Sequence, residues 1–315
     1  MRTPPARARL GLLPKLTVAT IACCVVAFSA VPASAEDNVD TTDPTAVAAL
    51  VAEAAPDSAQ PVDASSTGTA FETSTADATT TIPLDPERPI EVRADVAGRQ
   101  ISASITLPDG LDLDAAEAAG DGTVVYPSSS DASVAVQTLE SGDTRVQTVI
   151  PDRDATHEAA FGMEGFRAVI DSSGNAGFVQ DGREGAFVPV DAAWATDAAG
   201  APVSTHYEVQ GDRLVQIVTP SADTVYPIVA DPTWGWRNAA WGLTLSRSET
   251  ASIKDYGSAS AFCAALAKNQ RVAYACGIWA GYLQVQAATA NNRRPKGCLH
   301  LVVAPLPGAI SHTHC

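Results

Sequence analysis

Residues 133–150 read "SVAVQTLESGDTRVQTVI" and contain two β-prone runs on either side of a turn. The first run, 133–139, alternates Val with small or polar residues, and the second, 145–150, is rich in Val, Ile and Thr. Short runs of β-branched residues are typical of strands. The letters "SGD" at 141–143 place a glycine where the chain would reverse. The stretch therefore predicts two consecutive antiparallel strands.

Eight further runs of the same kind extend over residues 89–230, separated by Gly, Asp, Ser and Pro. No stretch between them carries the long helical crossover that neighbouring parallel strands need. The sequence therefore predicts an antiparallel β-sandwich or meander. The eight runs are "IEVRADV" (90–96), "RQISASITL" (99–107), "FRAVID" (166–171), "GFVQ" (177–180), "AFVPV" (186–190), "HYEVQ" (206–210), "RLVQIV" (213–218) and "VYPIV" (225–229).

A change of pattern follows at "VYPIVADPTWGW", residues 225–236. This junction resembles a β-rich module of uncharacterised secreted actinobacterial proteins, and the resemblance is best over residues 150–245. In that group an aromatic-Pro-aliphatic run ending in Ala-Asp-Pro precedes a Trp-rich stretch and a variable C-terminal module. The resemblance implies a location and a layout, and it supplies no catalytic residues. The matching residues are Tyr226, Pro227, Ala230, Asp231, Pro232, Trp234 and Trp236.

The first 35 residues have the layout of a secretory signal peptide. They carry four basic residues and no acidic one, then the apolar run "LTVATIACCVVAFSAV" and the small-residue site "ASA" ending at Ala35. We expect cleavage after Ala35 and a secreted, extracellular protein. The apolar run is shorter than the roughly 20 residues of a spanning helix, and no later segment is long and apolar enough. The sequence therefore predicts no permanent membrane span.

Charge and composition divide the rest of the chain into three parts. Residues 36–85 are rich in Ala, Thr, Ser and Asp, which predicts a disordered or weakly helical acidic lead-in. Residues 86–232 form the predicted β-rich acidic region, and residues 233–315 a basic module. Residues 36–232 hold 34 acidic and 8 basic side chains, a net charge of −26, whereas residues 233–315 hold 2 and 8, a net of +6. The acidic excess argues against nucleic acid as a partner.

The basic module is predicted to be helical and stapled by two disulfides. "SRSE" at 246–249 is a capping box, and helices are expected to about Tyr256, from Ser258, and over residues 271–292. The four cysteines beyond the signal peptide all lie here, as expected of disulfides in a secreted chain. Symmetry about the two turns predicts Cys263 paired with Cys276 and Cys298 paired with Cys315. The fold class is therefore α+β, with the β-rich region followed by a small helical module ending in a β-hairpin.

Two groups of side chains in the module are candidate binding residues. Trp234, Trp236 and Trp241 either stack on sugar rings or pack one part of the protein on another. The helix over 271–292 is apolar on more than one face, which is typical either of the centre of a small bundle or of a membrane-active or self-associating helix. Basic residues at its ends would then meet a cell wall or an anionic membrane surface. The candidates on this helix and after it are Trp279, Arg293, Arg294 and Lys296.

The C-terminal "HTHC", residues 312–315, raises the question of a metal site. A cysteine used in a disulfide cannot bind metal, so a site at His312 and His314 is kept only as the alternative. No zinc, nucleophile-elbow or phosphate-loop motif is present, and no cofactor is predicted. The sequence favours a non-catalytic exported protein that presents its basic module to an envelope or membrane in a toxin-like or adhesive role. The alternatives are a secreted hydrolase with a site in the β-rich region, drawing on His206, and a structural envelope protein.

Overall fold

The computed structural model describes residues 39–55, 57, 59–96, 98–171, 174–182, 184–265, 270–304 and 310–314. Side chains are described for these residues except 96, 270–279, 303–304 and 311–314. Val39–Cys315 form one unit by their internal contacts. The predicted signal peptide lies outside the described residues.

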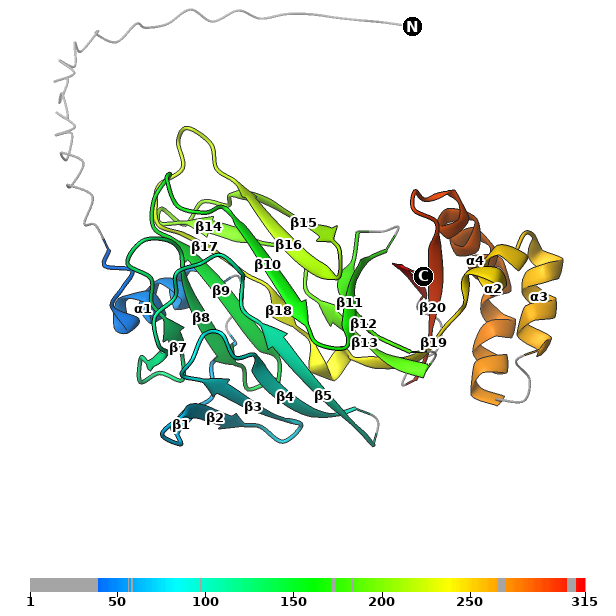
Figure 1. Cartoon of the computed structure of the whole chain (residues 1–315), viewed down its shortest axis with the longest axis horizontal. Helices are drawn as coiled ribbons and strands as arrows, with labels where there is room; N and C mark the ends of the chain where they lie inside the picture. The colour runs from blue at the N-terminus through cyan, green and yellow to red at the C-terminus, as the bar shows by residue number, and fades with distance from the viewer. Residues whose placement is uncertain are drawn as a thin grey trace, which may run out of the picture. The chain divides into compact units, whose positions relative to one another are not determined.

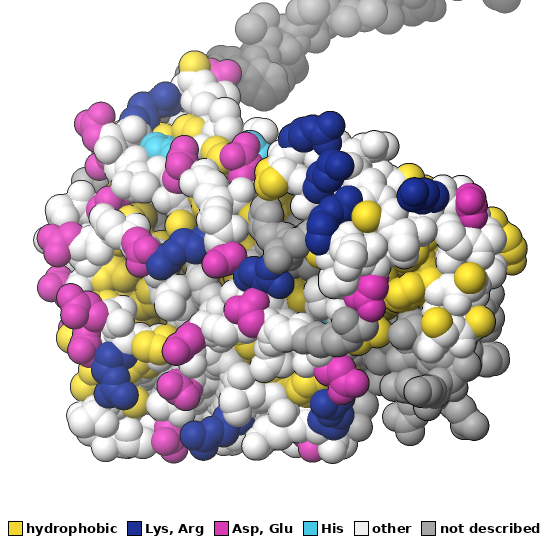
Figure 2. Space-filling view, turned by 45° about the vertical axis from the view of Figure 1, so that its right-hand side comes forward, with side chains coloured by type: hydrophobic (Ala, Val, Ile, Leu, Met, Phe, Trp, Pro, Cys, Tyr) yellow, Lys and Arg dark blue, Asp and Glu magenta, His cyan; other side chains and the backbone are white. Residues whose placement is uncertain are grey.

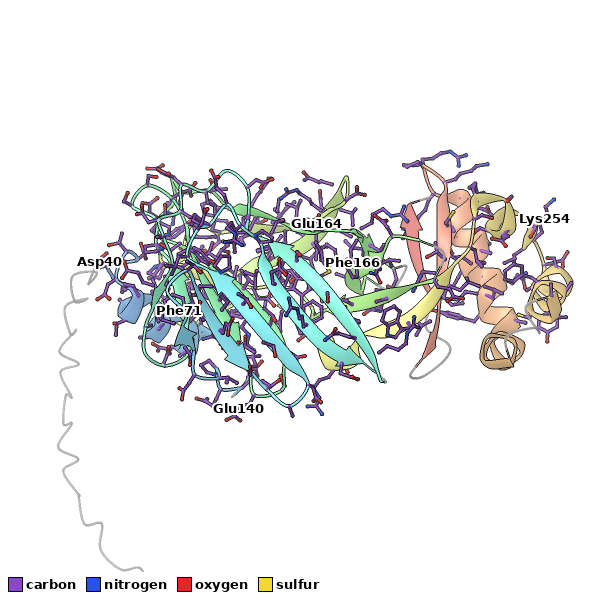
Figure 3. All side chains as sticks on the ribbon, turned by 60° about the horizontal axis from the view of Figure 1, so that its bottom comes forward. Asp40, Phe71, Glu140, Glu164, Phe166 and Lys254 are labelled. Atoms are coloured by element: carbon purple, nitrogen blue, oxygen red, sulfur yellow. The ribbon has the colours of Figure 1, made fainter. Side chains whose placement is uncertain are left out.

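The hairpin predicted at residues 133–150 is confirmed. Strand β8 (Ser133–Thr138) pairs antiparallel with β9 (Thr144–Ile150), and Thr138 lies opposite Thr144. Gly142 in the turn has a φ of 88°, a backbone conformation that favours glycine. Glu140 of the same turn is exposed at the edge of the molecule (Figure 3). Every residue of both strands is buried, because this pair lies inside its sheet and is covered on both faces.

The described strands form two sheets in which every pairing is antiparallel (Figure 1). Each of the ten predicted runs overlaps one of these strands. The first sheet has the order β1 (Ser65–Ser66), β2 (Ala70–Ser74), β3 (Ala78–Pro83), β4 (Ile90–Val96), β5 (Arg99–Thr106), β10 (Glu158–Met163), β16 (Arg213–Thr219) and β15 (Ser204–Gln210). The second has the order β21 (Ile310–His314), β20 (Gly297–Ala304), β19 (Ala240–Thr244), β13 (Glu184–Val190), β18 (Thr233–Trp234), β9, β8, β7 (Val124–Tyr126) and β6 (Glu117–Ala118), with β11 (Phe166–Ile170), β12 (Ala176–Gln180), β14 (Ala195–Asp197) and β17 (Ile228–Ala230) beside this path.

The two sheets share one hydrophobic core. Ile90 and Phe161 of the first sheet lie in the same buried cluster as Val136 and Phe178 of the second. Strand β4 alternates buried with exposed residues, so its other face meets solvent. The β-rich antiparallel prediction is confirmed, in the form of two sheets packed on a common core.

Residues 36–85, predicted as a disordered or weakly helical lead-in, contain a helix and also strands that the sequence did not indicate. Helix α1 (Pro44–Ala54) begins where the Asp43 carboxylate accepts a hydrogen bond from the Thr45 N–H at 2.9 Å. Its Val47 and Val51 are fully buried against the second sheet. Strands β1 to β3 also lie within this segment. Strand β1 is Ser-Ser with both residues exposed, and β2 and β3 contain Ser and Thr partly because one face of each meets solvent, so all three resemble low-complexity sequence.

The C-terminal module contains the three predicted helices, although some of their ends differ from the prediction. Helix α2 (Arg247–Ser252) has the predicted capping box between Ser246 and Glu249 and ends earlier than expected. Helix α3 (Tyr256–Ala265) includes Gly257, because the Asp255 carboxylate accepts from the Ser258 N–H and starts the helix there. Helix α4 (Gln270–Asn292) follows, and a short 3₁₀ turn, η1 (Trp236–Asn238), precedes the module's helices.

The expected boundary at residues 232/233 does not coincide with a break in the sheet. Strand β13 pairs with both β18 and β19, and β19 pairs with β20, so the second sheet continues into the module. The hairpin of β20 and β21 is present, but its predicted register is wrong by two residues. Cys298 lies opposite Thr313 rather than Cys315. The turn is therefore centred one residue earlier than the "PLPG" symmetry indicates.

Candidate functional site

Trp234 and Trp236 are buried and offer no open ring face to a ligand. Their exposed fractions are 0% and 2%. The Trp234 ring packs edge-on against Phe161 and is stacked on Phe178, with centroid distances of 5.7 and 6.4 Å. The Trp236 Nε1–H donates a hydrogen bond to Thr144 Oγ1 at 2.9 Å. A binding role for these two is therefore wrong, since both act as packing residues between the sheets.

Trp241 is half-buried, and a cation covers one face of its ring. The Arg99 guanidinium carbon lies 3.7 Å from the ring centroid, which is a cation–π contact between β5 and β19. The Trp241 Nε1–H is buried without a hydrogen-bond partner among the described residues. The contact indicates a structural role that joins the first sheet to the strand leading into the module.

Asp231, the carboxylate of the Ala-Asp-Pro junction, is a buried titratable group that the sequence did not single out as such. It is 0% exposed, and its Oδ1 accepts hydrogen bonds from the Trp194 N–H at 3.2 Å and the Tyr207 hydroxyl at 3.3 Å. Its Oδ2 has no partner among the described residues. Burial raises the pKa of Asp231 to about 7. The signal in the sequence is one acid within the otherwise apolar run "PIVADPTW".

A second polar contact anchors the segment after α1 to the same sheet. The Arg145 side chain is 3% exposed and its Nη2 lies 2.6 Å from Asp57 Oδ2. Its Nε–H donates to Thr233 Oγ1 at 3.2 Å. A buried guanidinium without such partners would be costly, so this contact holds the two segments in place. The buried Arg145 guanidinium has no open face toward a ligand.

One described hollow is a cleft of about 480 Å³ between the Asp85–Pro89 and Thr106–Leu113 segments. Carboxylates line it, and Asp109 is tied to Arg213 at 2.6 Å. No histidine lies among its lining residues. The described lining of this cleft therefore forms no hydrolytic triad that contains a histidine.

The described histidines do not form a metal or hydrolytic site. His206 is exposed, and its Nε2 lies 3.4 Å from Glu208. His157 Nε2 is 2.8 Å from the Tyr226 hydroxyl. His300 is 0% exposed and contacts Thr244 Oγ1 at 3.0 Å, and burial lowers the pKa of His300 to about 4. Within the described side chains no group of three His, Cys, Asp or Glu residues could hold a metal ion.

His312, His314 and two of the module's four cysteines, Cys276 and Cys315, have no described side chains. The backbone of His312 pairs with Leu299 and that of His314 with Gly297, whereas His300 pairs with Ser311. The pairing of Cys263 with Cys276 and of Cys298 with Cys315 stays a prediction. Cys263 and Cys298 themselves are buried and each is disulfide-bonded. Trp279 also lies outside the described side chains.

Three predicted binding residues, which we name the basic group, follow the last residue of α4: Arg293, Arg294 and Lys296. The Arg293 Nη2 donates to the Ile170 carbonyl at 3.2 Å, and the exposed Arg294 donates to the Arg293 carbonyl. Neither arginine is paired with a described carboxylate. Lys296 is exposed as well. Figure 2 shows Lys and Arg side chains gathered in a column on one face, whereas Asp and Glu predominate toward its left.

Part of α4 turns an uncharged surface to solvent. We define the outer face of α4 as Gly281, Tyr282, Val285, Ala288 and Asn292, all of which are exposed. Val285 is 58% and Tyr282 38% exposed, whereas Leu283 and Ala287 on the other side are buried. Basic residues after a helix also stabilise its carboxyl end, so the basic group has this structural role in any case.

No family model, curated protein or solved structure matches the chain. The fold and the candidate site define a two-sheet antiparallel β protein whose second sheet continues into a small, basic, helical module. None of the helices among the described residues has the length and apolar character needed to cross a membrane.

Proposed function

We propose that this protein is exported and, without catalysing a reaction, presents its basic module to the anionic surface of a cell envelope. The observation that carries the proposal is the basic group, because two arginines there bind only carbonyl oxygens among the described residues. A guanidinium without a carboxylate partner retains its capacity to bind phosphate or carboxylate.

The distribution of charge supports the same role. The module has a net charge of +6, and the preceding residues 36–232 have −26. An anionic surface would repel the acidic part and attract the module, so the molecule would approach it with the module first. The buried Trp234 and Trp236 hold β18 and η1 in the core, so the module is presented from a fixed base.

Two disulfides are part of the proposal. Pairing of Cys263 with Cys276 would join α3 to α4, and pairing of Cys298 with Cys315 would close the β20–β21 hairpin. Both would hold the basic group in place outside the cell, where disulfides persist. Non-reducing peptide mapping of the exported protein tests the pairing, and any other partner for Cys263 or Cys298 would overturn it.

The binding test uses the whole exported chain and insoluble bacterial cell walls as well as phospholipid vesicles. Co-sedimentation is expected with anionic walls and with vesicles that contain phosphatidylglycerol, and to a much smaller extent with phosphatidylcholine alone. Binding should decrease as salt is raised, because exposed charges are screened over about 10 Å at 0.1 M salt. Binding to neither anionic support at low salt would refute the proposal.

A further inference from the structure

The outer face of α4 is unusual because it is exposed and carries no charge. Residues 272–292 include no Asp, Glu, Lys or Arg. Solvent-facing sides of helices in soluble proteins are ordinarily charged or polar. Here Val285 and Tyr282 are the most exposed large side chains of the described part of α4.

These residues form one continuous stripe. With about 100° between successive residues of a helix, the five residues of the outer face fall within an arc of about 120°. The buried Leu283, Ala287 and Ala290 fall on the opposite side, in the cluster with Leu299 of β20. The exposed apolar residues are therefore a coherent face rather than scattered exceptions. A Cβ built on Gly281 would meet nothing within 4 Å, so the stripe is open.

The basic group lies directly beyond the end of this stripe. Asn292 closes the outer face, and Arg293, Arg294 and Lys296 follow within four residues. An apolar helix face bordered by cations fits the boundary of a bilayer, where acyl chains and phosphates occur together. Tyrosine suits the headgroup level in particular.

Resting on the function proposed above, we propose that the outer face of α4 docks on a bilayer of anionic phospholipids. Helix α4 would lie in the plane of the membrane, with Val285 and Tyr282 at the acyl boundary and the basic group on lipid phosphates. A wall polymer would neutralise the same cations but would leave the apolar stripe in water. Charge complementarity together with the adjoining apolar face therefore favours lipid as the occupant.

The experiment compares two substitutions of exposed valines in the whole exported chain. Val285→Ser removes apolar surface from the outer face, and the control Val225→Ser does the same in the β-rich region, where Val225 is 40% exposed. Vesicles of phosphatidylglycerol and phosphatidylcholine are the lipid probe. Val285→Ser removes about two methyl groups that would lie partly inside the acyl boundary. This loss is expected to weaken vesicle binding about fivefold. The control should bind as the wild type does.

Further measurements distinguish a failure of this inference from a failure of the proposed function. Val285→Ser should bind cell walls unchanged, whereas Arg293→Gln with Arg294→Gln should bind both supports about 30-fold more weakly. If Val285→Ser binds vesicles as tightly as the wild type while the arginine variant fails, the docking inference is overturned and the proposed function stands. If the wild type binds neither support, both are overturned. A dimer in sedimentation velocity that Val285→Ser abolishes, without vesicle binding, would show that the face binds a second copy and would also overturn the inference.

Discussion

Replacing Asp231 by Asn should change how the stability of the protein depends on pH. The carboxylate is fully buried, its Oδ1 is held by Trp194 and Tyr207, and its Oδ2 has no described partner. Burial raises its pKa from 3.8 to about 7. Arg145 and Asp191 are the other charged groups that act on it, in opposite directions. The carboxyl group is thus more stable in its protonated form in the folded protein.

The direction of this pH dependence follows from comparing the pH at which the folded and the unfolded chain lose the Asp231 proton. Below pH 3.8 both hold the proton, so the group has no unfavourable effect there. Between pH 3.8 and about 7 the unfolded chain loses its proton first, so the free energy of unfolding falls as the pH rises. Above about pH 7 the folded protein bears the full cost of burying the ionised carboxylate. The difference between the folded and unfolded pKa values corresponds to about 4 kcal/mol. Asp231→Asn removes this dependence.

The assay is urea unfolding at pH 4, 6 and 8, followed by tryptophan fluorescence. The variant should be close to the wild type at pH 4 and more stable at pH 8, by up to about 4 kcal/mol. The unpartnered amide donor of Asn reduces this gain by about 1–3 kcal/mol. The control Glu91→Gln, exposed on the outer side of β4, should show no such change. If Asp231→Asn and the wild type differ by the same amount at all three pH values, the reasoning about the buried carboxyl group is wrong.

Three further substitutions test the packing around the module. Gly242→Ala should destabilise the protein by more than about 2 kcal/mol, because the new Cβ would clash with the His300 ring and lie 2.6 Å from the Leu301 carbonyl oxygen. A urea midpoint equal to that of the wild type would contradict this. Trp236→Phe should cost about 1–3 kcal/mol through the lost hydrogen bond to Thr144 and the space left behind, whereas a stability equal to that of the wild type would mean that the ring is not part of the core. His300→Gln should gain stability relative to the wild type as the pH falls from 6.5 toward 4, because burial lowers the pKa of this base and the unfolded wild type binds the proton first. The opposite contribution of Asp231 is the same in both proteins and cancels in this difference; a difference in stability that is equal at pH 6.5 and pH 4 would refute the assignment.

The strands of the β-rich region could be predicted because their β-branched runs alternate between core and solvent or lie wholly in the core. The strands at residues 65–83 could not, since Thr-rich sequence on a half-exposed sheet resembles disordered sequence. The register of the β20–β21 hairpin depended on the centre of one turn, and an error of one residue there shifts the pairing by two.

The candidate site was predicted unevenly for a similar reason. Basic residues after a helix and a helix that is apolar on more than one face are visible in sequence, so Arg293 and Arg294 could be named as candidates. For Trp234 the sequence offered packing as one of two alternatives, and the burial of Asp231 was not visible, because burial depends on which strands of the two sheets face one another. Tertiary packing decides whether an aromatic or acidic residue meets water.

The most direct test of the central claim is the binding of two charge-matched double variants to anionic vesicles and cell walls at low salt. Arg293→Gln with Arg294→Gln removes two cations from the basic group, and Arg88→Gln with Arg93→Gln removes two exposed cations from the acidic region. At about 1 kcal/mol per cation near the surface, the first variant should bind about 30-fold more weakly than the wild type. The second should bind as the wild type does or slightly less. Equal losses in the two variants would contradict the account, because binding would then follow net charge and not the basic group.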